Sequence, residues 1–129
     1  MKRTLVVLVI AGCMGLATRS DAHHSFAATY LEDQEITIEG DLVQFLYRNP
    51  HSFVHVLAPD PKTKEMVRWA VEWGGGGQLG QQGVTRETLK PGDHVIITGS
   101  PGRNPEDHRL RMRTILRPKD GWRWGGVVD

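Results

Sequence analysis

The chain has 129 residues, of which 24% are charged, with a formal net charge of +1 and one cysteine. Such a length supports one small domain and is too short for two. The near-neutral charge argues against long-range attraction to nucleic acid or anionic lipid. A lone cysteine excludes an internal disulfide and a cysteine-based zinc site.

Residues 1–22 have the layout of a cleavable export signal. Two basic residues near the start precede an apolar run, residues 5–17, and a polar segment that ends at Ala22. Small residues at the last and third-last positions complete the pattern, and the apolar run is too short for a membrane-spanning helix. We therefore expect cleavage after Ala22, a mature domain of residues 23–129 that starts at His23, and a periplasmic or secreted location.

A lipoprotein signal is the alternative. Residues 10–13 also match a lipobox, in which residues 1–12 are removed and Cys13 is acylated, so that the domain is lipid-anchored in the cell envelope. Removal of residues 1–22 takes away the cysteine, three of the 16 basic residues and one of the 15 acidic residues. The mature chain then carries one more acidic than basic residue and keeps all six histidines.

Three strands are predicted in the first half of the mature chain from a period of two. Residues 35–47 alternate apolar and polar side chains around Gly40, which marks a bend or a bulge. Residues 51–57 and 66–73 alternate in the same way. The short connection between these two strands predicts a hairpin.

Two more strands follow a glycine-rich connection. A short helix is expected within residues 74–83 or at residues 86–89, before strands over 94–99 and 110–116 and a tail from Pro118 that carries two tryptophans. Three strands, a weakly helical connection and two strands are the element order of an OB-type barrel. We therefore expect an all-β fold, a small five-stranded OB-like barrel with at most one short helix. A six-stranded up-and-down barrel or a small sandwich is the alternative.

Several short motifs occur together in one known family. They are His23-His24-Ser25-Phe26-Ala27, Asn49-Pro50-His51, Trp69-Ala70-Val71-Glu72, Gly83-Val84-Thr85 and Leu89-Lys90-Pro91-Gly92-Asp93. With them the chain resembles a family of small exported bacterial proteins of unknown function. The resemblance covers nearly the whole mature chain and implies export and a single β-rich domain, but it names no activity.

The chain departs from this family in the glycine-rich connection. Members have a leucine-bearing helical segment where this chain has Gly74–Gly77 and Gly80. Each interior glycine costs a helix up to about 1 kcal/mol relative to alanine. The helix here is therefore expected to be short.

The histidine pair at the predicted cut is the first candidate for chemistry. If His23 is the first residue, its amine and ring, together with the ring of His24, form a compact ligand set for a late divalent metal. The α-amino group has a pKa of about 8, so a metal displaces its proton near neutral pH. Copper is preferred, with zinc or nickel next. The alternative is a solvated chain end without a ligand.

His51 and Glu72 are the other candidate site residues. His51 follows the Asn-Pro turn and is the best placed of the later histidines to be a third ligand, the alternative being a surface histidine that closes the turn. Glu72 faces away from Trp69 and is a candidate ligand, a candidate general base or the acceptor that orients a ligating imidazole. A plain ion pair with Arg68 or Arg111 is the alternative for Glu72.

These observations predict a non-catalytic binding module that holds a transition metal, copper before zinc, through His23, His24 and His51. The alternative is a metal-independent interaction domain that holds an envelope protein or a small ligand on a barrel face around Phe53 and Trp69. No nucleic-acid partner is expected, and membrane contact is expected only with a lipidated cysteine. An enzyme is less expected, because a lone carboxylate has no evident partner acid, nucleophile or fixed metal.

Overall fold

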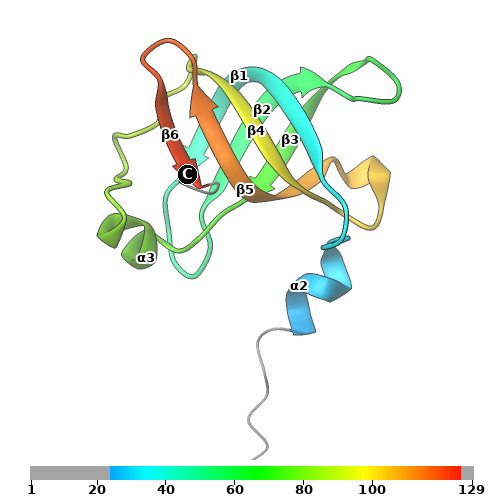
Figure 1. Ribbon diagram of the computed structural model, residues 1–129, viewed down its shortest axis with the longest axis horizontal. Helices are drawn as coiled ribbons and strands as arrows, with labels where there is room; N and C mark the ends of the chain where they lie inside the picture. Colours follow the sequence, from blue (N-terminus) through cyan, green and yellow to red (C-terminus); the bar gives the residue numbers. More distant parts are fainter. Residues whose placement is uncertain (1–23, 126–129) are drawn as a thin grey trace, which may run out of the picture.

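Five strands close into a barrel in the computed structural model, which describes residues 24–125 (Figure 1). Their bounds are β1 Ile36–Leu46, β2 Phe53–Pro59, β3 Met66–Glu72, β4 His94–Pro101 and β5 Arg109–Arg117. The order around the barrel is β1, β2, β3, β5 and β4, and β4 pairs back onto β1. Only β3 and β5 pair in parallel. The predicted OB-like barrel is confirmed, and its two alternatives are not what the chain forms.

β1 is shared between two neighbours, and Gly40 lies close to the point where the neighbour changes. The first half of the strand, Ile36–Asp41, pairs with β4, and the second half, Asp41–Leu46, pairs with β2. A Cβ on Gly40 would lie 1.9 Å from the carbonyl oxygen of Leu57. Only glycine lets the two strands approach so closely, so the predicted break in the strand is part of how the barrel coils.

The core consists of alternate side chains from the barrel strands, as the period of two predicts. Burial of one such aliphatic side chain stabilises the fold by about 1.5–3 kcal/mol. Side chains with no exposed surface include Val54, Val56, Val71, Val95, Ile97 and Leu110.

β2 begins two residues later than predicted, at Phe53. Ser52 closes the preceding turn, because its Oγ accepts a hydrogen bond from the Arg48 amide and donates one to the Arg48 carbonyl, each at 3.2 Å. His51 therefore lies in the turn, outside the strand that the sequence predicts over residues 51–57.

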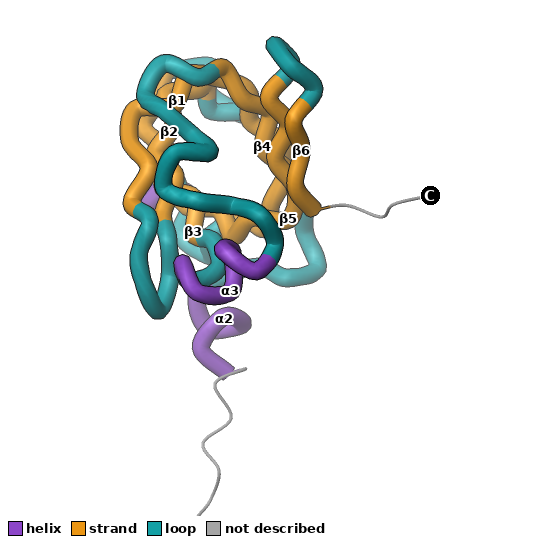
Figure 2. The backbone as a smooth tube through the Cα atoms, turned by 90° about the vertical axis from the view of Figure 1, so that its left-hand side faces the viewer, coloured by secondary structure: helices purple, strands orange, loops and turns teal. Residues whose placement is uncertain are grey.

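Two short helices lie at the same end of the barrel (Figures 1 and 2). α2, His24–Thr29, precedes β1 and is absent from the sequence prediction, whereas α3, Gly76–Gln81, is the short helix expected between β3 and β4. Residues 86–89, the other candidate for that helix, form a turn. A Cβ on Gly75 would lie 2.6 Å from the carbonyl oxygen of Pro50, so the glycine run lets α3 pack against the turn before β2. Within the described part of the chain, no helix has the length and apolarity to cross a membrane.

A sixth strand, β6 (Trp122–Gly125), lies within the segment that the sequence presents as a tail. It pairs antiparallel with the last part of β5. The ring of Trp124 meets that of Trp73 edge to face, with 5.1 Å between centroids. β6 therefore packs against the barrel as an additional strand beside β5.

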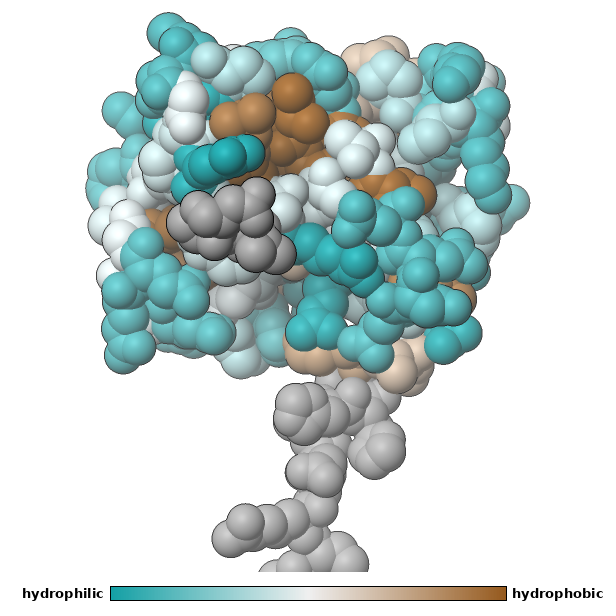
Figure 3. All heavy atoms as spheres, in the orientation of Figure 1, coloured by the Kyte–Doolittle hydropathy of each residue, from teal (hydrophilic) through white to brown (hydrophobic). Residues whose placement is uncertain are grey.

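The outer surface of the barrel is mostly hydrophilic, and its apolar area is limited on the face shown in Figure 3. The strand register pairs Ile96 with Leu116 on the outer side of β4 and β5, and both are partly exposed. A limited apolar area of this kind is ordinary on a protein surface.

Candidate functional site

One edge of β5 pairs with neighbouring strands over only part of its length. β4 runs along the other edge, while β3 pairs with Arg109–Arg111 and β6 pairs with Thr114–Arg117. Met112 and Arg113 lie between these two pairings, opposite neither strand. β3 and β6 thus lie end to end along β5 and leave a gap.

A cavity of about 260 Å³ lies at this gap. Its walls come from β3, β5, β6, both helices and the turn before β2, so six separate parts of the chain build it. A volume of this size is near the lower end for small-molecule sites. The lining residues are Phe26, Pro50, His51, Glu72, Trp73, Gly74, Gly75, Gln78, Leu79, Gln82, Arg111, Met112 and Trp124.

Glu72 is held in this cavity by one buried hydroxyl and one guanidinium. Tyr30 is fully buried and donates a hydrogen bond from its Oη to Glu72 Oε2. Arg109 Nη2 lies 3.6 Å from the same oxygen, so Arg109, and not the expected Arg68 or Arg111, is the arginine at Glu72. Burial, and then the hydrogen bond to Glu72 and its charge, raise the pKa of Tyr30 well above its usual value. The hydroxyl therefore remains a donor at any ordinary pH.

His51 faces the second oxygen of the same carboxylate. Its Nδ1 lies 3.7 Å from Glu72 Oε1, which is an ion-pair distance and too long for a hydrogen bond. The ring also meets Phe26 of α2 edge to face, with 5.5 Å between centroids. The side chain of His51 is 40% exposed, whereas that of Glu72 is 13% exposed. His51, Glu72 and Phe26 all line the cavity, and this part of it is termed its mouth.

Arginines fasten the N-terminal segment to the barrel beside this mouth. The guanidinium of Arg111 lies 3.7 Å from the centroid of the Phe26 ring, and its Nη1 lies 2.9 Å from Glu32 Oε1. Arg103 Nε donates to the carbonyl oxygen of Ala27 at 2.7 Å. From Phe26 onward the segment is therefore a bound part of the fold, which is not the behaviour of a solvated chain end.

The predicted metal ligands are only partly within the described residues. His23 lies outside them, and His24 is the first residue of α2, with its side chain also outside the description. His51 and Glu72 are brought together at the cavity mouth. No group of three or more His, Cys, Asp or Glu residues close enough to hold a metal occurs among the residues that the structure describes. A metal site here would need ligands from the N-terminal histidines.

The structure does not bring Phe53 and Trp69 onto one face. Phe53 is partly exposed on the outer side of the barrel wall, with the Arg48 guanidinium 5.4 Å from its ring centroid. Trp69 is 4% exposed and lines a second, smaller cavity of about 120 Å³, together with Asp60 and Arg109. The two aromatic residues therefore contribute to different places.

Three further histidines have partners outside the first cavity. His94 lies between two carboxylates, with Nδ1 2.8 Å from Asp41 and Nε2 3.0 Å from Glu39. The hydrogen bonds to Glu39 and then to Asp41 raise the pKa of His94. His108 lies 3.2 Å from Asp60, and His55 accepts a hydrogen bond from an arginine. Each of these sites has at most one histidine.

Tyr30 is the functional residue that sequence reasoning missed. It lies in a short segment between α2 and β1, where neither a period of two nor a helical period marks an inward side chain. Its burial depends on a long-range contact, the isolated bridge between Tyr30 and Gly102. The only available signal was its position inside the family resemblance, just after the His-His-Ser-Phe-Ala motif.

The fold and the cavity define a small OB-type barrel with a ligand-sized cavity beside its N-terminal helix. The chain belongs to a family of unknown function, DUF6152, whose model matches residues 11–111. The match confirms the family resemblance and includes His23, His51, Glu72 and Arg111, whereas Met112 and Trp124 lie beyond it. No curated protein and no solved structure matches the chain.

Proposed function

We propose that this protein is an exported, non-catalytic binding module that holds a transition-metal ion, copper before zinc, at the mouth of its cavity. His23 and His24 are the primary ligands and His51 is the third. The module works in the periplasm or after secretion, or at the envelope surface if the cysteine is acylated. One observation supports the proposal above the others, which is the contact between Phe26 and His51.

This contact matters because of the short distance along the chain. Phe26 is two residues after His24 and three after His23. Its ring packs on His51, which in turn faces Glu72 at 3.7 Å. His23 and His24 are therefore at most three residues from a side chain that contacts His51. This short separation supports the proposal that all three histidines bind one metal ion.

The chemistry of the ligand set suits copper. A free amine and neutral imidazoles are nitrogen ligands, which copper(II) binds more strongly than other divalent first-row metals. The negative charge of Glu72, whose Oε1 lies 3.7 Å from Nδ1 of His51, favours the tautomer that carries a proton there, which leaves Nε2 for the metal. A carboxylate behind a ligating imidazole also fixes the orientation of the ring.

Titration of the purified mature protein, beginning at His23, with Cu(II) while recording the d–d absorption tests this proposal. We expect a stoichiometric band that disappears in the His23→Ala, His24→Ala double variant. Glu72→Gln should weaken Cu(II) binding by about 10-fold to 100-fold, the usual effect of a partner behind a ligand.

His55→Ala is the matched control, since His55 lies on the barrel wall away from the cavity and should not affect the band. A version with one extra alanine before His23 separates the amine from the rings as ligands. Unchanged affinity in the double variant would eliminate the proposal.

A further inference from the structure

We propose that the cavity between β3, β5 and β6 also binds a small, planar, uncharged organic ligand that offers both a hydrogen-bond acceptor and a donor. An aromatic ring that carries a primary carboxamide is the simplest example. This site does not depend on the metal, so it goes beyond the proposed function and stands or fails separately.

The walls of the cavity favour a flat ligand. Phe26, Trp73 and Trp124 all line it. Trp73 is fixed between two rings, with centroid distances of 5.1 Å to Trp124 and 5.9 Å to Phe45. Rigid aromatic walls bind planar groups by stacking or by edge-to-face contact. The volume of about 260 Å³ accommodates a single ring with one substituent.

Trp73, which lines the cavity, carries a hydrogen-bond donor without a partner among the described residues. This donor is its Nε1, which is buried. By contrast, Nε1 of Trp124 donates to Gln82 Oε1 at 2.9 Å. A buried donor without a partner costs roughly 1–3 kcal/mol, so a ligand acceptor that reaches Trp73 recovers that free energy. The ligand should therefore carry an acceptor such as a carbonyl oxygen.

Glu72 supplies a complementary acceptor. Its Oε2 is occupied by Tyr30, while Oε1 faces His51 at 3.7 Å, beyond hydrogen-bond distance. A carboxylate oxygen accepts from an N–H or O–H group, and a bond to a charged acceptor is stronger than one to a neutral acceptor. The ligand should therefore carry a donor at the end nearest the cavity mouth.

The charges of the cavity favour a neutral ligand. Arg109 Nη2 lies 3.6 Å from Glu72, and Arg111 Nη1 lies 2.9 Å from Glu32. Each guanidinium therefore already has a carboxylate, and Glu72 already has a cation. A charged ligand would lose its hydration without gaining a free counter-charge, and that loss is expensive in a partly buried site.

NMR of the indole N–H groups in metal-free protein with EDTA tests this inference. Benzamide is the probe, benzoate is a negatively charged control of the same shape, and benzylammonium is a positively charged control of similar size. We expect a saturable downfield shift of the Trp73 indole proton with benzamide, with a Kd of about 1 mM for a ligand of this size. Benzoate and benzylammonium should bind at least about fivefold more weakly.

The protein contains its own control for this measurement. Trp69 Nε1 is also buried without a partner, but Trp69 lines the second cavity and not the first. Its indole proton should not move with benzamide. Equal responses of Trp69 and Trp73, equal affinities for the three probes, or no saturable shift up to about 10 mM would each overturn the inference.

Trp73→Phe sharpens the test, because it keeps an aromatic wall and removes the donor. We expect about a threefold to tenfold loss of benzamide affinity, the value of one hydrogen bond. Trp122→Phe, which alters a tryptophan that does not line the cavity, should leave the affinity unchanged. The wild-type NMR experiment decides the question even if Trp73→Phe does not fold.

The two proposals can fail independently. The His23→Ala, His24→Ala double variant should lose Cu(II) but keep benzamide, whereas Trp73→Phe should do the reverse. If the His23→Ala, His24→Ala double variant lost benzamide as well as Cu(II), the claim that the cavity binds its ligand without metal would be overturned.

Discussion

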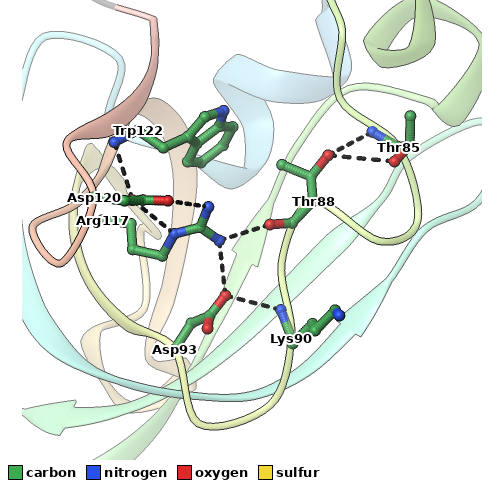
Figure 4. Close-up of polar contacts among 7 residues, drawn as sticks. All are labelled: Thr85, Thr88, Lys90, Asp93, Arg117, Asp120 and Trp122. Carbon is green, nitrogen blue, oxygen red and sulfur yellow. Dashed lines mark hydrogen bonds and ion pairs between the residues drawn. The ribbon is translucent and has the colours of Figure 1, made fainter.

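Arg117 and Arg111 lie on the same strand, β5, but at opposite ends of the barrel and in different states. Arg117 donates from Nη1 to Asp93 Oδ2 at 3.0 Å and to the Thr88 carbonyl at 2.7 Å (Figure 4). Its Nε and Nη2 bind the two carboxylate oxygens of Asp120 at 3.0 and 2.9 Å. Arg111 has one carboxylate partner, Glu32, and otherwise lies over an aromatic ring.

Arg117 therefore has a structural role, whereas Arg111 belongs to the candidate functional site. The Arg117 side chain is 18% exposed and joins the loop before β4 to the turn between β5 and β6. Its bidentate and carbonyl bonds use all three nitrogens of the guanidinium, and the hydrogen bonds to Asp120 and then Asp93 outweigh burial and raise its pKa. The Arg111 side chain is 39% exposed and lines the cavity. At one end of the barrel, therefore, all three nitrogens of the arginine are bonded to the protein, and at the other end the arginine has one carboxylate partner and lines the cavity.

Arg117→Ala should have the largest effect on stability. It leaves Asp93 and the Thr88 carbonyl without their partner and should lower the free energy of unfolding by about 2–3 kcal/mol. Urea denaturation measures the loss. Arg123→Ala, which removes an exposed arginine from β6, is the control and should change stability by less than about 0.5 kcal/mol. Equal losses of unfolding free energy in the two variants would show that the bonds of Arg117 do not stabilise this end of the barrel.

Tyr30→Phe should have the next largest effect and probes the opposite end. Removal of the buried hydroxyl deprives Glu72 of its hydrogen bond and should cost about 1–2 kcal/mol of unfolding free energy. Thr37→Val is a useful comparison, because it removes an exposed hydroxyl bonded to Thr98 at 2.9 Å and should cost far less. A neutral result for Tyr30→Phe would mean that water replaces the hydroxyl at Glu72.

Arg111→Ala should change global stability by only about 0.5 kcal/mol, because a half-exposed ion pair and one cation–π contact are weak. Its effect should instead be local. Amide hydrogen exchange should accelerate over residues 26–32 and stay unchanged over residues 114–117. A global loss as large as that of Arg117→Ala would remove the contrast between the two arginines.

The smallest expected effect is a dependence of stability on pH at His94. Its pKa is raised in the folded state by Glu39 and Asp41, so the contribution of this cluster is fully present below the unfolded pKa of about 6.5. The contribution is lost as the pH rises through the higher folded pKa. The difference in unfolding free energy between the wild type and His94→Gln should therefore shrink from pH 5.5 to 8.5. A difference that stays constant over this range would exclude the mechanism.

The barrel could be predicted because its strands are half-buried and alternate regularly. Val54, Val56 and Val71 show which side of β2 and β3 faces inward without any knowledge of their partners. β6 could not be found in this way, since four residues carry too little alternation and only the contact of Trp124 with Trp73 defines them.

The site was harder to predict than the fold, because its contacts join distant parts of the chain. Glu72 and His51 are identifiable from the sequence, but the partner of Glu72 is Tyr30, 42 residues away. The place of His51 depends on the bonds of Ser52 that close the turn, so that β2 begins later than predicted. The alternation of apolar and polar residues predicts on which side of a strand a side chain lies, but it does not predict which distant side chain it contacts.

The parallel pairing of β3 with β5 has a consequence for motion. It joins only three residues on each strand, Ala70–Glu72 with Arg109–Arg111, and is the shortest pairing among the described barrel strands. These partners are far apart in sequence, so their meeting closes a long loop and should occur late in folding. In the native state the same seam should open first, which native-state hydrogen exchange would detect. A ligand that spans Glu72 and Met112 bridges this seam, and its binding should slow that opening.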